Sequence, residues 1–261
     1  AKIRTAHGVF RASAVGKGVL RTALNNISLL MGKSMSSISS TSESGFDARR
    51  VNMVESQIRT NQVTSEAVIE AIEGVARERF VPEDLRGIAY VDDDIALEGG
   101  RCVMEPRVLA RMIQTLQADS NSHALVVGAG SGYAAAVLSR VAQTVVAEES
   151  VPGLAAMAGE AVEAMGITNV VIEQGALMDA AAEHGPFDVI LFGGSIAQVP
   201  SNLADFMEEG GRAIAVVSEA SEGYGAATLF TKFGGHLGEV SAFDAAIPVL
   251  PEFLAPKKFS F

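Results

Sequence analysis

Tryptophan is absent from this chain, cysteine occurs once, and no long apolar run is present. The single cysteine, Cys102, excludes an internal disulfide, which suits a reducing compartment. No apolar stretch approaches the roughly 18–20 residues that a transmembrane helix requires, so we expect no membrane span. The four histidines and the cysteine lack any metal-binding spacing, so we expect no metal site.

Basic residues are outnumbered by acidic ones, with 20 Lys and Arg against 31 Asp and Glu, so the formal net charge is −11 over 261 residues. This balance argues against a nucleic-acid backbone as the main partner. The basic residues that exist gather early, since residues 1–42 hold six Lys or Arg and no acid, and residues 34–44 are rich in serine. Three interpretations of residues 1–45 stay open: a mitochondrial transit peptide, a flexible basic tail, or a segment foreign to the native chain. We predict a cytoplasmic protein, or a mitochondrial one if this extension derives from a targeting segment.

Three alternating glycines follow an apolar run in the middle of the chain. The run begins at Ala124, the glycines are Gly128, Gly130 and Gly132, and a helix-forming segment continues to Leu138. This order predicts a strand, a tight turn and a helix, with bare main chain and unpaired helix N–H groups facing a ligand. The alternative interpretation is an ordinary turn between strand and helix that binds nothing.

A second strand is predicted over residues 144–149, and it ends in Glu148 and Glu149. A carboxylate roughly 20 residues after the first glycine is placed to accept hydrogen bonds from two ribose hydroxyls. The turn and the acid together predict a βαβ unit that binds a nucleotide or a nucleoside.

Strand-like and helix-like segments alternate through the rest of the chain. Further strands are expected over residues 169–175, 187–194, 211–217, 227–233 and 237–243. Helices are expected within residues 46–86 and over residues 107–116, 152–165, 177–184 and 200–208. Repeated βα units predict an α/β fold with a seven-stranded, mostly parallel sheet, and the last two strands predict an antiparallel hairpin at its edge. We therefore expect a helical cap with a substrate loop over residues 46–106 and the sheet domain over residues 107–261.

Several short stretches occur in an order and spacing that point to one family. They are Arg79-Phe-Val-Pro82, Ala89-Tyr90, the Gly-Gly-Arg…Glu-Pro loop at 99–106, and residues 127–138, 166–170, 185–188 and 210–212. Over residues 46–253 the chain resembles the protein-L-isoaspartate O-methyltransferase family, and within it the alphaproteobacterial branch. The resemblance implies a Rossmann-like class I fold that uses S-adenosyl-L-methionine. It also implies methylation of isoaspartyl carboxylates in peptides or proteins, a repair reaction.

The residues themselves and the resemblance together give candidates for the site. The cofactor-binding candidates are Gly128, Ala129, Gly130, Ser131, Gly132, Tyr133, Glu149, Gly175 and Ala176. The catalytic candidates are Arg101, Cys102 and Glu105 in the loop before Pro106. Arg101 could bind the acceptor carboxylate as a fork, or be a solvated loop charge. Cys102 could be a reactive thiol or an apolar packing residue, and Glu105 could replace a lost polar contact.

Two departures from the family pattern leave a second function open. Active members carry Thr-Ile-Ser where this chain has Cys102-Val103-Met104, so the loop hydroxyl tied to catalysis is missing. Members also carry an acid that helps to hold the adenine, and here that position is Ala176. The alternative is a weak or inactive methyltransferase-fold protein that serves as a structural or binding subunit, for example in a larger complex. A dinucleotide-binding dehydrogenase is a further alternative, against which the terminal hairpin argues.

Overall fold

The computed structural model describes residues 45–218 and 224–255. Almost all of the predicted extension over residues 1–45 therefore lies outside the described residues. The chain divides into two compact units, residues 1–48 and 49–261, and the fold below is that of the second unit.

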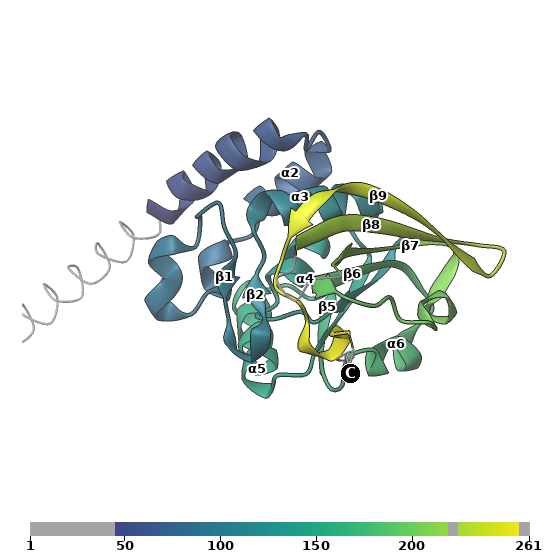
Figure 1. The fold of residues 1–261 in the computed structure, drawn as a ribbon. Helices are drawn as coiled ribbons and strands as arrows, with labels where there is room; N and C mark the ends of the chain where they lie inside the picture. Colours follow the sequence, from purple (N-terminus) through teal and green to yellow (C-terminus); the bar gives the residue numbers. More distant parts are fainter. Residues whose placement is uncertain (1–44, 219–223, 256–261) are drawn as a thin grey trace, which may run out of the picture. The chain divides into compact units, whose positions relative to one another are not determined.

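A seven-stranded sheet forms the centre of this unit (Figure 1). The order of its strands is β5-β4-β3-β6-β7-β8-β9. Its strands are β3 (His123–Val127), β4 (Thr144–Glu149), β5 (Val170–Gln174), β6 (Phe187–Ile196), β7 (Met207–Val217), β8 (Tyr224–Phe233) and β9 (His236–Ala246). Strands β3 to β7 run parallel, and β8 is antiparallel to both of its neighbours. The predicted mostly parallel sheet with an antiparallel terminal hairpin is confirmed.

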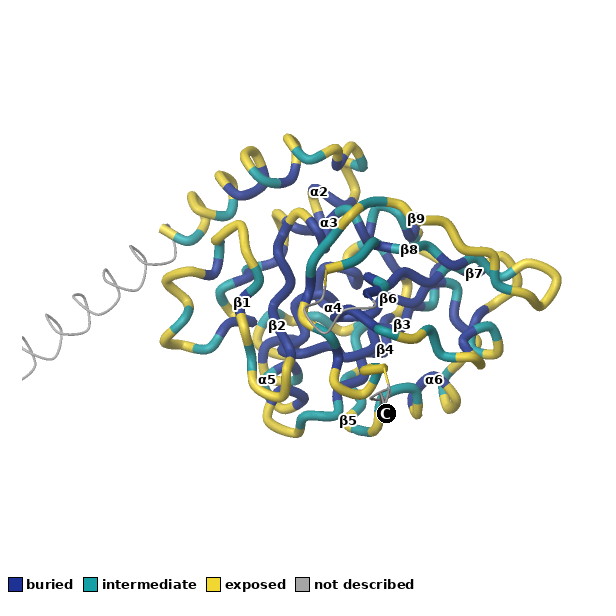
Figure 2. The backbone as a smooth tube through the Cα atoms, viewed as in Figure 1, coloured by how far each residue is buried: buried dark blue, intermediate teal, exposed yellow. Residues whose placement is uncertain are grey.

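The sheet separates two buried cores, because successive side chains of a strand point to opposite faces. In β3, Ala124 and Val126 belong to one core, and Leu125 and Val127 belong to the other. The helices are α2 (Glu66–Glu73), α3 (Pro106–Leu116), α4 (Tyr133–Leu138), α5 (Pro152–Ala164) and α6 (Asp179–His184). Apolar residues of α2 to α5 join the first core, and those of α6 join the second. Figure 2 shows the central strands as the buried part of this arrangement.

Short helical turns precede the sheet, as the sequence predicted for this region. Residues 49–53 are helical and lead into the π-helical turn Val54–Ile58. The other turns are 3-10 helices at Arg59–Asn61, Arg77–Phe80 and Glu83–Ile88. A two-stranded hairpin, β1 (Ile95–Ala96) with β2 (Cys102–Val103), lies within the region predicted to hold the helical cap and the substrate loop. Among the residues that the structure describes, no helix has both the length and the apolar character that a bilayer crossing needs.

The helix predicted over residues 200–208 is wrong. The structure has only a 3-10 turn at Leu203–Phe206, and β7 begins directly afterwards at Met207. Met207 pairs with Phe187 of β6, and its side chain is fully buried. The chain is thus drawn into the sheet several residues before the predicted strand, which leaves too few residues for a helix.

Candidate cofactor site

The glycine-rich turn and the predicted acid lie together at the carboxyl ends of β3 and β4. Gly128, Gly130 and Gly132 have φ angles of +71°, +57° and +90°, a region that glycine adopts without steric cost. The two strands run parallel, so Glu149 at the end of β4 lies beside the turn. The Gly130 N–H donates a hydrogen bond of 2.7 Å to Glu149 Oε2.

Several main-chain N–H groups of the turn itself, which precede α4, are paired within the protein. Those of Gly128 and Ala129 donate to the carbonyl oxygen of Glu148, at 3.0 and 2.9 Å. The Gly132 N–H donates to the carbonyl oxygen of Ala129 at 3.0 Å. These bonds fix the turn against β4, and they leave these amides engaged within the protein.

Glu149 is fully buried, and its carboxylate is bound by Arg101 from the loop before α3. Arg101 Nε lies 3.1 Å from each carboxylate oxygen, and the Val151 N–H donates to Oε1 at 2.9 Å. The Gly130 N–H supplies the contact to Oε2, so both oxygens have protein partners. The residue predicted to bind the acceptor thus contacts the residue predicted to bind the ribose.

The rest of the Arg101 guanidinium is bound by a carboxylate that the sequence did not single out. Nη2 donates to Glu252 Oε1 at 2.7 Å, and Nη1 donates to Glu252 Oε2 at 3.1 Å. Ser150 Oγ accepts from Nη2 at 2.9 Å and donates to Glu252 Oε1 at 2.6 Å. Burial opposes ionisation of Glu252, but the hydrogen bonds from Arg101 and Ser150 outweigh it and lower the pKa of that carboxyl group.

The segment that carries Glu252, residues 247–253, lies along the carboxyl end of β6. Its Pro248 carbonyl accepts from the Ser195 N–H at 3.0 Å, and its Leu250 N–H donates to the Ser195 carbonyl at 2.9 Å. Figure 1 shows the segment in yellow, returning from β9. Leu250 is 1% exposed, and a Cβ atom built on Gly128 would come within 2.9 Å of Leu250 Cδ2. A leucine side chain therefore covers the first glycine of the turn.

The other two catalytic candidates lie in the same loop. Cys102 is buried, and burial raises the pKa of its thiol, which keeps the sulfur protonated. Together with Ala129 and Ser131 it lines a cavity of about 10 Å³. Glu105 precedes α3, its carboxylate pairs with the Arg107 guanidinium, and burial raises its pKa.

Two of the cofactor candidates point into the protein. Ser131 Oγ donates to the Phe80 carbonyl at 2.5 Å. Tyr133 is 3% exposed, and the guanidinium carbon of Arg77 lies 4.7 Å from its ring centroid. Arg77 is itself fully buried and donates to main-chain carbonyls, so it fixes the loop over the Tyr133 ring. These side chains serve packing in this conformation.

The last two candidates lie at the end of β5. The Gly175 N–H donates to the Glu149 carbonyl at 3.2 Å, and Ala176 is exposed. Beside them, Glu148 is fully buried and accepts from the N–H groups of Met178 and Ala180, at 2.7 and 2.8 Å. Glu148 therefore positions the start of α6, a role that its place next to Glu149 in the sequence did not reveal.

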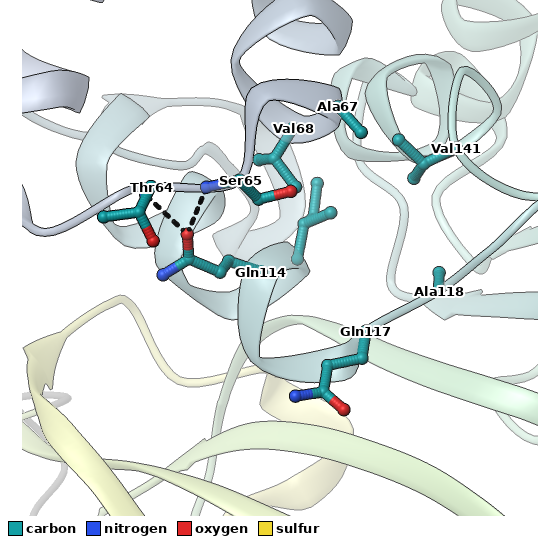
Figure 3. Close-up of a pocket in the computed structure, with 9 residues that line it drawn as sticks. Thr64, Ser65, Ala67, Val68, Gln114, Gln117, Ala118 and Val141 are labelled. Atoms are coloured by element: carbon teal, nitrogen blue, oxygen red, sulfur yellow. Dashed lines mark hydrogen bonds between the residues drawn. The ribbon is translucent and has the colours of Figure 1, made fainter.

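A larger hollow of about 340 Å³ lies elsewhere, between α2 and α3 (Figure 3). One of its polar groups, Gln114 Oε1, accepts hydrogen bonds from the N–H groups of Thr64 and Ser65, at 2.7 and 2.9 Å. This side chain satisfies main-chain donors at the start of α2, so it is committed to holding the two helices together. None of the predicted site residues lines this hollow.

The sheet order, the single reversed strand, the glycine turn after β3 and the acid ending β4 define a Rossmann-like class I methyltransferase. Enzymes of this class take their methyl group from S-adenosyl-L-methionine. A sequence profile of the protein-L-isoaspartate(D-aspartate) O-methyltransferase family matches residues 48–237. The chain therefore belongs to this family.

Known proteins agree with this assignment. The chain is 35% identical over 173 residues to protein-L-isoaspartate O-methyltransferase 2 of Pelobacter propionicus, covering 66% of this chain and 77% of that protein. It is 33% identical over 205 residues to the Opitutus terrae protein-L-isoaspartate O-methyltransferase, covering 77% and 85%. A Plasmodium falciparum structure, described as a putative protein-L-isoaspartate O-methyltransferase in complex with S-adenosyl-L-homocysteine, shares the fold. Its TM-score is 0.66 at 23% identity, over 78% of this chain and 98% of that one.

The site in its observed conformation does not fit the cofactor. The turn and Glu149 have the right chemistry for an adenosyl group, but Leu250 covers Gly128 and Arg101 engages Glu149. The cavity of about 10 Å³ lies on the Cys102 side of the turn, and its lining includes Ala129 and Ser131 but neither Glu149 nor Leu250. In this conformation, Leu250 lies in the space over Gly128 and Arg101 holds the Glu149 carboxylate, the two places predicted to receive an adenosyl group.

Proposed function

We propose that this chain is an S-adenosyl-L-methionine-dependent O-methyltransferase that methylates isoaspartyl carboxylates in peptides or proteins. The observation that carries the proposal is the meeting of the positive-φ glycine turn with Glu149, in a chain of this family. We propose that the Glu149 carboxylate accepts hydrogen bonds from the ribose hydroxyls once Arg101 has left it. The glycine turn then lies under the rest of the cofactor.

The acceptor chemistry suits a site with few titratable groups. An isoaspartyl carboxylate is ionised near neutral pH, so the reaction needs positioning and desolvation of an oxygen rather than a general base. Of the three catalytic candidates, Arg101 has the fork that binds a carboxylate. We therefore propose that the released Arg101 orients the acceptor. The catalytic roles of Cys102 and Glu105 stay predictions.

The proposed partner is a peptide or protein substrate, and the proposed compartment is the cytoplasm. The net charge of −11 supports a partner other than nucleic acid. The mitochondrial alternative depends on residues 1–45, and the alphaproteobacterial branch within the family stays a prediction.

The direct test is methyl transfer from labelled S-adenosyl-L-methionine to two peptides of one sequence, one isoaspartyl and one aspartyl. We expect a base-labile methyl ester on the isoaspartyl peptide alone. Equal labelling of both peptides would contradict the proposed substrate. Labelling of neither, in an assay where another member of the family labels the isoaspartyl peptide, would favour the alternative of an inactive binding subunit.

A further inference from the structure

We infer that residues 247–253, together with Arg101, form an intramolecular latch over the cofactor site, which must be released before S-adenosyl-L-methionine can bind. The inference rests on the proposed function, because it concerns regulation of that same site. We call residues 247–253 the latch segment.

Arg101 and the ribose of a cofactor would compete directly for Glu149. A ribose would need the carboxylate oxygens that already accept from Arg101 Nε, at 3.1 Å each. Arg101 is in turn held by both oxygens of Glu252, which belongs to the latch segment. One guanidinium thus ties the acid of the cofactor site to the C-terminal part of the chain, and bidentate ion pairs of this kind are strong and specific in geometry.

The latch segment would also compete with a cofactor for the space over the glycine turn. Leu250 of the latch segment covers Gly128, and its side chain also approaches Gly194, where an added Cβ would lie 2.8 Å from Leu250 Cγ. Phe253 packs edge-on against Phe192, with ring centroids 5.6 Å apart. Leu250 therefore occupies the space over Gly128, and the contact of Phe253 with Phe192 attaches the same segment to β6.

The latch segment is attached to β6 in a way that permits its release. Pro248 and Pro251 have no N–H, so the segment cannot pair with β6 as a complete strand. Pro248, Pro251 and Glu252 are exposed, although Leu250 beneath them is buried. Residues 247–249 also line an open groove of about 650 Å³, so solvent reaches the outer side of the segment. It can therefore leave without breaking the seven-stranded sheet.

The latch predicts a measurable penalty on cofactor binding. A ligand that binds only the released form has an apparent Kd equal to its intrinsic Kd divided by the released fraction. Glu252→Gln removes the charge that holds Arg101, so it should raise the released fraction. Leu250→Ala, which leaves the hydrogen bonds of Glu252 unchanged, should do so through lost packing.

The test is calorimetric titration of the full chain with S-adenosyl-L-homocysteine. We would compare the wild type with Glu252→Gln, Leu250→Ala and the control Glu239→Gln on exposed β9, each verified as folded by circular dichroism. The expected result is at least fivefold tighter binding by Glu252→Gln, with Leu250→Ala also tighter and the control unchanged. Equal, measurable affinity in all four proteins would overturn the latch and leave the proposed function standing. Lack of binding in all four would overturn the proposed function, and the latch with it.

Discussion

At the residue scale, Glu149 and Arg101 depend on each other. Glu149 has no exposed surface and Arg101 is 2% exposed, so neither charge can be solvated in place of its partner. The desolvation of such a pair is offset only by its mutual attraction and hydrogen bonds. Removal of Arg101 would leave Glu149 buried without a charged partner, and removal of Glu149 would leave Arg101 with only the partly exposed Glu252 as its counter-charge. Either loss is more costly than loss of an exposed ion pair.

This dependence predicts a large loss of stability for Glu149→Ala. We expect the free energy of unfolding to fall by about 3–5 kcal/mol, because Arg101 would lose its most buried partner. Urea denaturation would measure it, with Glu163→Ala on the exposed side of α5 as the matched control, for which we expect a change within about 0.5 kcal/mol. A loss in Glu149→Ala no larger than that of the control would contradict the role assigned to the pair.

The sequence predicts that Glu149 lies beside the glycine turn, but it does not predict the ion pairs of Arg101. Glu149 could be placed beside the glycine turn because both end neighbouring parallel strands. Arg101 is separated in the sequence from Glu149 by 48 residues and from Glu252 by 151 residues. An ion pair over such separations leaves no periodic pattern in the sequence, so the sequence predicts neither the pairing of Arg101 with Glu149 nor the part that Glu252 plays.

At the element scale, the predictions succeeded where a strand is buried on both faces. The predicted bounds of β4 match the structure, because its apolar run stops at two carboxylates. The segment over residues 200–208 failed, because pairing of Met207 with Phe187 is a tertiary contact that overrides local helix propensity. Similarly, the hairpin of β1 and β2 is too short to leave an alternating pattern.

One contact between elements should make stability depend on pH. Asp94, in the loop before β1, accepts a 2.6 Å hydrogen bond from the Glu105 N–H at the start of α3. Burial raises the pKa of this carboxyl group from 3.8 to about 6. The folded chain then binds the proton more tightly than the unfolded chain. The stabilisation from this group is complete below about pH 4 and is lost as the pH rises through about 6.

The variant Asp94→Asn keeps the acceptor oxygen but cannot ionise. We expect the free energy of unfolding of the variant, measured relative to that of the wild type, to rise by about 1–3 kcal/mol as the pH increases from 4 to 7. Chemical denaturation at several pH values would give this difference. A difference between the two proteins that stays constant with pH would contradict the assignment.

At the scale of the whole molecule, the last part of residues 49–261 returns to the edge of the sheet where the glycine turn lies. The βα alternation builds the sheet and brings the glycine turn to the carboxyl ends of the strands, where ligands bind in open α/β folds. After β9, the latch segment returns to β6 at that same edge. The alternation could be predicted from sequence, whereas the return path depends on packing of Leu250 and Phe253 that no local pattern specifies. We therefore infer a methyltransferase in which the latch segment occupies the cofactor site.

The measurement that tests this claim most directly is amide hydrogen exchange of the full chain with and without saturating S-adenosyl-L-homocysteine. The Leu250 N–H, bonded to the Ser195 carbonyl, and the Ala197 N–H, bonded to the Phe253 carbonyl, report on the latch segment. Our account predicts faster exchange at these two amides when the ligand binds, because the segment must leave the site. Slower or unchanged exchange at both amides in the saturated protein would contradict it.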